Sequence, residues 1–220
     1  MICPYCNKSF KRESTITRHM CEQKRRHLAM KDRHVVIAFT AFNKFFMMSQ
    51  KKQYSYDEFC KSPYYTAFVK FGSFVSNVNP LYPDNFIHYV ITSGEKLDKW
   101  CNDALYDQYV IKLVKTESIE TALERSITHF MKWGIDHKQE WNDYFRNVSL
   151  NRGTYDIKDG KVSPWLVLNS SNGKELLNKL DDEQLKTINS IMDIPYWLNQ
   201  FRIKKSDLAL VKSVIKESNL

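Results

Sequence analysis

The fold of the amino terminus depends on one stretch of sequence, Cys3-Pro-Tyr-Cys6-Asn-Lys-Ser-Phe10-Lys-Arg-Glu-Ser-Thr-Ile16-Thr-Arg-His19. Two cysteines separated by two residues can place both thiolates about 2.3 Å from the same tetrahedral zinc ion. His19, on a helix expected to follow, adds an imidazole nitrogen, and Phe10 and Ile16 form a small apolar core. A segment this short cannot fold by burial alone, so metal binding would supply the folding free energy. The spacing therefore predicts a zinc site with Cys3, Cys6 and His19 as ligands.

The fourth ligand of this site is open between two side chains. Cys21 lies about 200° around a regular helix from His19, so the helix would have to unwind there. His27 lies roughly 80° around but two turns away, about 12 Å along the helix axis. Local unwinding costs less than bridging that axial gap, and a thiolate is a strong zinc ligand. We therefore favour Cys21, with His27 as the alternative and a three-ligand site, or one completed by water, as the third arrangement.

These residues resemble a zinc finger of the two-Cys two-His type, or its two-Cys His-Cys variant, over about the first 27 residues. The sequence departs from that family where the second histidine normally falls, since residues 23–25 are Gln, Lys and Arg. The resemblance implies a small ββα fold that reads bases from one face of its helix and contacts phosphates with nearby cations. The base-reading positions that it implies are Arg12, Thr15 and Arg18, with Ser14 beside them at the second helical position, and the phosphate contacts that it implies are Lys8, Lys11, Lys24, Arg25 and Arg26.

Positive charge is concentrated around the same motif. The chain has 220 residues and a formal net charge of +8. Residues 1–34 contain nine Lys or Arg and three Asp or Glu, so this segment carries +6. A basic run alone is typical of a solvated surface, but its coincidence with a metal motif favours binding to a polyanion. Three of the five cysteines fall in the first 21 residues, which favours reduced thiols and a metal site over a disulfide framework.

The rest of the chain is predicted to be mainly α-helical. Hydrophobic residues make up 43% of the sequence, enough for a sizeable core, and no Gly or Pro interrupts residues 11–62. A capping box at Ser55 and Glu58 predicts one helix start, and Ser118 predicts another. The Asp159-Gly160 pair predicts a turn and a short β-hairpin near 151–162. We expect a zinc finger over 1–27, a helical domain over 28–147, and a C-terminal helical subdomain over 148–220 packed on it.

Other groups with chemical potential are weaker. Asp136, His137, Glu140 and Asp143 resemble a nuclease cluster only superficially, because their spacing is ordinary for a charged helix end. Aromatic and basic residues interleave over 64–71, as in single-strand binders, although at helical spacing the apolar members more often belong to a core. No glycine-rich phosphate loop, nucleophile elbow or paired-acid motif is present, so no catalytic residue is assigned.

As a whole, the chain resembles small proteins of tailed bacteriophages, with a finger ahead of a helical body that contains Ser62-Pro-Tyr-Tyr-Thr-Ala-Phe-Val-Lys-Phe-Gly72 and Val162-Ser-Pro-Trp165. The favoured function is binding of nucleic acid, with DNA favoured over RNA, as an accessory factor in phage replication, recombination or transcription. The alternative is an adaptor that recruits a host or phage protein through the finger and the helical body. No apolar run reaches the roughly 18 residues that span a membrane, and no signal peptide is visible. We therefore expect a cytoplasmic protein, in the host bacterial cytoplasm if it is phage-encoded.

Overall fold

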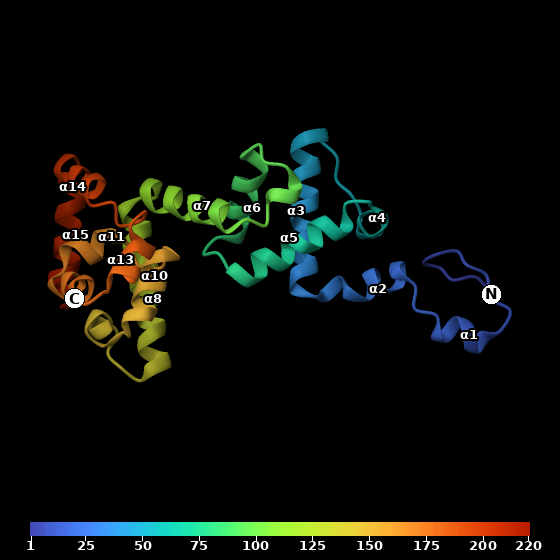
Figure 1. The fold of residues 1–220 in the computed structure, drawn as a ribbon, viewed down its shortest axis with the longest axis horizontal. Coiled ribbons are helices and arrows are strands. Elements are labelled where there is room, and N and C mark those ends of the chain that lie inside the picture. The colour runs from blue at the N-terminus through green and yellow to red at the C-terminus, as the bar shows by residue number, and fades with distance from the viewer. The chain divides into compact units, whose positions relative to one another are not determined.

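The structure is a computed structural model that describes all 220 residues (Figure 1). It is mainly α-helical, as predicted, with fifteen α-helices, three 3₁₀ turns and no β-strand. The single β-type pairing is an isolated antiparallel bridge between Ile2 and Ser9. The chain divides into two compact units, Met1–Leu105 and Tyr106–Leu220, and each is described by itself. None of the helices combines the length and the apolar character that crossing a membrane requires.

Most helices lie wholly within one unit. Those of the first unit are α1 (Glu13–Arg18), α2 (Glu22–Leu28), α3 (Arg33–Gln50), α4 (Tyr56–Lys61), α5 (Tyr65–Val78) and α6 (Pro83–Thr92), with 3₁₀ turns at Ala29–Lys31 and Leu97–Lys99. Those of the second are α8 (Ile119–His137), α9 (Tyr144–Asn147), α10 (Leu150–Lys158), α11 (Pro164–Asn169), α12 (Ser171–Asn178), α13 (Asp182–Ile188), α14 (Ile194–Ile203) and α15 (Lys205–Ser218), with a 3₁₀ turn at Trp141–Asp143. Helix α7 (Asp103–Thr116) contains the boundary. The capping box of Ser55 and Glu58 begins α4, and the Ser118 side chain caps α8, both as predicted.

The core of the first unit is built on the close approach of α3 and α5. A Cβ atom at Gly72 would lie only 2.1 Å from the carbonyl oxygen of His34, so no larger residue fits there without moving the backbone. The ring of Phe42 on α3 packs 4.9 Å from that of Phe59 and 5.2 Å from that of Phe68, measured between centroids. All three phenylalanines are buried. These contacts hold the short helix α4 against α3 and thereby position the surfaces on which α2 packs.

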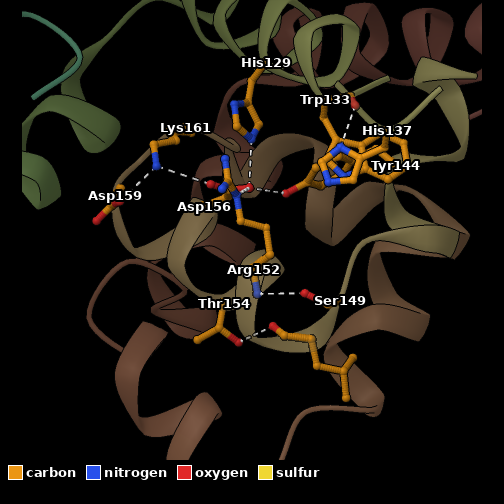
Figure 2. Close-up of polar contacts among 11 residues, drawn as sticks. His129, Trp133, His137, Tyr144, Ser149, Arg152, Thr154, Asp156, Asp159 and Lys161 are labelled. Atoms are coloured by element: carbon orange, nitrogen blue, oxygen red, sulfur yellow. Dashed lines mark hydrogen bonds and ion pairs between the residues drawn. The ribbon is translucent and has the colours of Figure 1, made fainter. Parts of the chain in front are cut away.

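The second unit contains a buried carboxylate surrounded by hydrogen-bond donors (Figure 2). Asp156 on α10 contacts His129 Nε2 at 2.8 Å and accepts bonds from Tyr144 Oη at 2.9 Å and Arg152 Nε at 2.8 Å. Lys161 Nζ lies 3.3 Å from its other oxygen. Burial opposes ionisation, but the hydrogen bonds and charges of His129, Arg152 and Lys161 hold the pKa of Asp156 well below its usual range. The network ties α8, α9 and α10 together through one charged group.

The β-hairpin predicted near 151–162 is wrong, because α10 (Leu150–Lys158) occupies most of that segment. The Ser149 side chain caps its first turn, and Gly153 lies against the side chain of Leu176. Gly160 has a φ of 72°, the left-handed conformation that ends a helix as readily as it closes a hairpin turn. The Asp159-Gly160 pair does mark a turn, but the turn follows a helix and does not join two strands.

Candidate metal centre

The first two cysteines lie on a tight knuckle at the start of the chain. The N–H of Asn7 donates to the carbonyl of Cys3, and the N–H of Cys3 donates to that of Lys8, both at 2.9 Å. Asn7 adopts the left-handed conformation with a φ of 57°, which its short polar side chain tolerates. The predicted two strands of the ββα finger are thus reduced to this turn and the Ile2–Ser9 bridge. The knuckle brings the thiols of Cys3 and Cys6 to the same side of the turn.

The remaining two donors come from a break between helices. Helix α1 ends at Arg18, and His19 has an extended backbone with a ψ of 119°. Helix α2 begins at Glu22 with Cys21 as its N-cap residue, and the N–H of Lys24 donates to the Cys21 sulfur at 3.4 Å. Figure 1 shows α1 and α2 as two separate helices joined by an extended segment. This is the local unwinding that a contribution from Cys21 requires.

Four ligand atoms converge at this point. The Sγ atoms of Cys3, Cys6 and Cys21 and a ring nitrogen of His19 all lie within 4.8 Å of one another. Cys3 Sγ is 4.0 Å from Cys21 Sγ, and Cys6 Sγ is 3.2 Å from His19 Nε2. A zinc tetrahedron with bonds of 2.0–2.3 Å has ligand-to-ligand edges of roughly 3.5–3.8 Å. The cluster could therefore hold one metal ion with little movement, and three sulfurs with one imidazole form a donor set compatible with zinc.

The electrostatics of the thiols also suit a cation. Burial opposes ionisation of Cys3, yet the backbone N–H groups of Cys6 and Tyr5 bring its pKa below the ordinary value. At Cys6 the backbone N–H of Lys8 favours the thiolate, but burial and the neighbouring thiols of Cys3 and Cys21 raise the pKa. Three thiolates this close repel one another. A divalent cation among them relieves that repulsion and favours loss of all three protons.

His27, the alternative fourth ligand, points away from the cluster. Its Nε2 lies 3.3 Å from a carboxylate oxygen of Asp57 on α4. Its ring packs 5.1 Å from that of Tyr5 and 5.8 Å from that of Tyr56, measured between centroids. The structure thus brings Cys21, and not His27, to the other three donors. The ring of Phe10 lies 4.6 Å from that of His19, as part of the small core beside the cluster.

Most of the residues proposed to contact nucleic acid lie at the surface. The exposed members of that set are Lys8, Lys11, Arg12, Ser14, Thr15, Arg18 and Arg25. Lys24 is half-buried, and its Nζ donates to the carbonyl of His19 at 3.3 Å, so it supports the break between the helices. Helix α1 begins at Glu13, directly after Arg12, so Arg12 precedes the helix while Thr15 and Arg18 lie on it.

Arg26 has a role that the sequence did not indicate. Its guanidinium donates to the carbonyl of Cys60 at 2.5 Å, lies 4.3 Å from the centre of the Tyr65 ring, and pairs with Glu22. The hydroxyl of Tyr56 donates to the carbonyl of Arg26 at 2.6 Å. These contacts fasten α2 to α4 and α5, so the metal cluster is attached to the helical part of its unit. No local motif marks this docking, because the partners on α4 and α5 lie thirty or more residues away.

The cluster of Asp136, His137, Glu140 and Asp143 does not assemble. His137 Nδ1 bonds to the carbonyl of Trp133, and Asp143 pairs with Arg146. The four donors at Cys3, Cys6, His19 and Cys21 are the one group of three or more His, Cys, Asp or Glu side chains in the chain with metal-binding geometry.

Comparisons with protein-family models, with curated proteins and with solved structures give no match. The interpretation of the centre therefore rests on its own geometry.

Proposed function

We propose that Cys3, Cys6, His19 and Cys21 bind one zinc ion and that the module organised by this ion binds nucleic acid, DNA first. The observation that carries the proposal is the coincidence of a four-donor cluster with an exposed basic surface. Zinc is favoured over other divalent ions because a sulfur-rich tetrahedral set suits it, whereas magnesium and calcium require oxygen ligands. The ion would have a structural role, since all four positions of the tetrahedron are filled by protein.

The distribution of charge supports a polyanionic ligand. The first unit contains sixteen Lys or Arg and nine Asp or Glu, a net charge of +7. The second unit contains seventeen and sixteen, a net charge of +1. Nearly all the excess positive charge therefore belongs to the unit that holds the metal cluster. Such concentration attracts phosphate backbones and makes binding depend strongly on salt.

Arg12 and Arg18 are the residues that we propose for direct contact. Both are exposed, and they stand at opposite ends of the short helix α1, since Arg12 is its N-cap residue and Arg18 its last residue. A guanidinium can bind guanine through two parallel hydrogen bonds in the major groove, or a phosphate through a charge-assisted one. A single finger reads only about three base pairs, so further contacts from the same unit must supply affinity. A place in phage replication, recombination or transcription stays a prediction from resemblance.

The test is a salt titration of duplex DNA binding by the zinc-loaded chain, followed by fluorescence anisotropy. Affinity should fall steeply with salt, and the Arg12→Ala/Arg18→Ala variant should bind more weakly, with a log–log slope shallower by about 2 for two lost phosphate contacts. The matched control is Lys204→Ala/Lys205→Ala, which removes two exposed charges from the second unit. Removal of zinc by a chelator should abolish binding. Equal binding by both double variants would refute the assignment.

A protein-interaction adaptor is the second candidate, and one observation favours it. Met20, Leu28 and Met30, on and beside α2, are 51%, 63% and 46% exposed. Flexible methionine side chains are over-represented at protein-binding surfaces. The same titration separates the two functions, because an adaptor would show little affinity for DNA at any salt concentration.

A further inference from the structure

A groove lined by aromatic side chains lies beside α4, on the first unit. Its volume is about 380 Å³, within the range of small-ligand sites, and its wall is formed by the end of α3 and residues 54–64. Phe46, Tyr54 and Tyr64 provide the rings, Pro63 adds a further apolar surface, and Lys61 stands at the rim. None of these residues belongs to the metal cluster or to the base-reading positions.

The rings differ in how much surface they offer. Phe46 is only 8% exposed and forms the floor, with its centroid 5.0 Å from that of Tyr54 and 6.2 Å from that of Tyr64. Tyr64 lines the groove and is 51% exposed, so its ring is accessible to a ligand. The ammonium of Lys52 lies 4.2 Å from the centre of the Tyr54 ring. The groove thus has a buried aromatic floor, one free stacking platform and a cation at its side.

The charges around the groove favour an anionic ligand. Lys52 and Lys61 are exposed, and neither forms an ion pair. The single acid in the lining is Glu58, whose Oε2 already accepts bonds from the N–H and the hydroxyl of Ser55, both at 2.8 Å. These bonds and the charge of Lys52 hold the pKa of Glu58 below its ordinary value, so the groove keeps one negative charge against the two positive charges of Lys52 and Lys61.

We propose that this groove binds an unpaired base of single-stranded nucleic acid, stacked on Tyr64, with Lys52 and Lys61 beside the flanking phosphates. Stacking on an aromatic ring accepts any base, and adjacent cations track the backbone. Helix α4 connects this groove to the metal module, because Tyr56, Asp57 and Cys60 on the same helix contact α2. The inference rests on the proposed function in taking nucleic acid as the ligand, but it uses none of the residues assigned to the finger.

The experiment measures binding of a fluorescein-labelled oligothymidylate of about 12 nucleotides to the full zinc-loaded chain. Tyr64→Ala should weaken binding roughly 5- to 150-fold, the loss expected for one stacked base. Tyr64→Phe should bind as the wild type does, because it keeps the ring. Lys61→Ala should make the salt slope shallower by about 0.7, the value for one phosphate contact on a single strand. The matched control is Tyr155→Ala, which removes a tyrosine that is 58% exposed on the second unit.

The outcomes separate this inference from the function proposed above. Duplex binding that is unchanged by Tyr64→Ala, with single-strand binding lost, supports the groove. Single-strand binding that is insensitive to Tyr64→Ala overturns it, and the duplex titration with Arg12 and Arg18 variants still stands or falls by itself. A proline-rich peptide that binds in a Tyr64-dependent way, with no binding of oligothymidylate, also overturns it in favour of a protein ligand. Single-strand binding that needs Tyr64 but survives Arg12→Ala/Arg18→Ala supports the groove independently of the finger.

Discussion

Replacing Cys21 by alanine is expected to weaken zinc binding far more than replacing His27 by alanine. The Cys21 sulfur lies 4.0 Å from that of Cys3, within the reach of one ion, whereas His27 faces Asp57 at 3.3 Å. Structural zinc sites bind with about 10–16 kcal/mol, so an even share for one of four ligands is about 3 kcal/mol. Loss of that share corresponds to a dissociation constant raised roughly 100-fold.

The His27→Ala variant should keep its zinc. The change removes the ring contacts with Tyr5 and Tyr56 and the pair with Asp57, whose side chain is 68% exposed. Such an exposed pair contributes at most about 1 kcal/mol to folding. Replacing His27 should therefore lower the free energy of unfolding and leave the zinc affinity unchanged. Cys101→Ala is the matched cysteine control, because that half-buried thiol lies outside the cluster.

The assay is competition for zinc between the full chain and a chromophoric chelator, combined with alkylation of free thiols. In the zinc-loaded wild type, the thiols of Cys3, Cys6 and Cys21 should be protected together. In Cys21→Ala, Cys3 and Cys6 should become reactive at zinc concentrations that still protect them in the control. Wild-type zinc affinity in Cys21→Ala, together with its loss in His27→Ala, would show that the ligand geometry argued above is wrong.

Three further changes test the rest of the structure. Gly72→Ala should lower the free energy of unfolding in urea by about 3 kcal/mol or more, because its methyl group would meet the backbone of α3 at 2.1 Å. Asp156→Asn should cost about 2–3 kcal/mol in the same assay, since it removes the charge that Arg152 and Lys161 face, both of which reach solvent. Because the pKa of Asp156 is lowered by folding, its contribution is present above its unfolded pKa of about 3.9 and is lost as pH falls towards the folded value, so the difference between wild type and Asp156→Asn should shrink below about pH 4. Arg26→Ala should destabilise the first unit by about 1–3 kcal/mol, measured by the same denaturation, because the carbonyl of Cys60 and the ring of Tyr65 lose their partner.

The sequence predicts helix starts correctly where the stabilising hydrogen bonds join neighbouring residues. The capping box of Ser55 and Glu58 and the cap at Ser118 involve atoms three residues apart, so the sequence contains all the information that they need. The C-x2-C spacing likewise places two thiols on one turn without help from the rest of the chain. The Asp159-Gly160 pair predicts a turn but not the element beside it. A left-handed glycine follows helix α10 in the same backbone conformation that a hairpin turn would use.

The sequence by itself determined a mainly helical chain with a metal-binding motif in its most basic segment, because periodicity, caps and ligand spacing act over short distances. Only the tertiary structure decided which side chain completes the metal cluster. His27 pairs with Asp57 on α4, whereas the break after α1 places Cys21 beside Cys3, Cys6 and His19. The tertiary structure also decided that Arg26 docks on α4 and that His129 on α8 and Tyr144 on α9 meet Asp156 on α10 (Figure 2). Such contacts join residues far apart in the chain, and their strength depends on how deeply the fold buries them. A local sequence pattern therefore does not predict them.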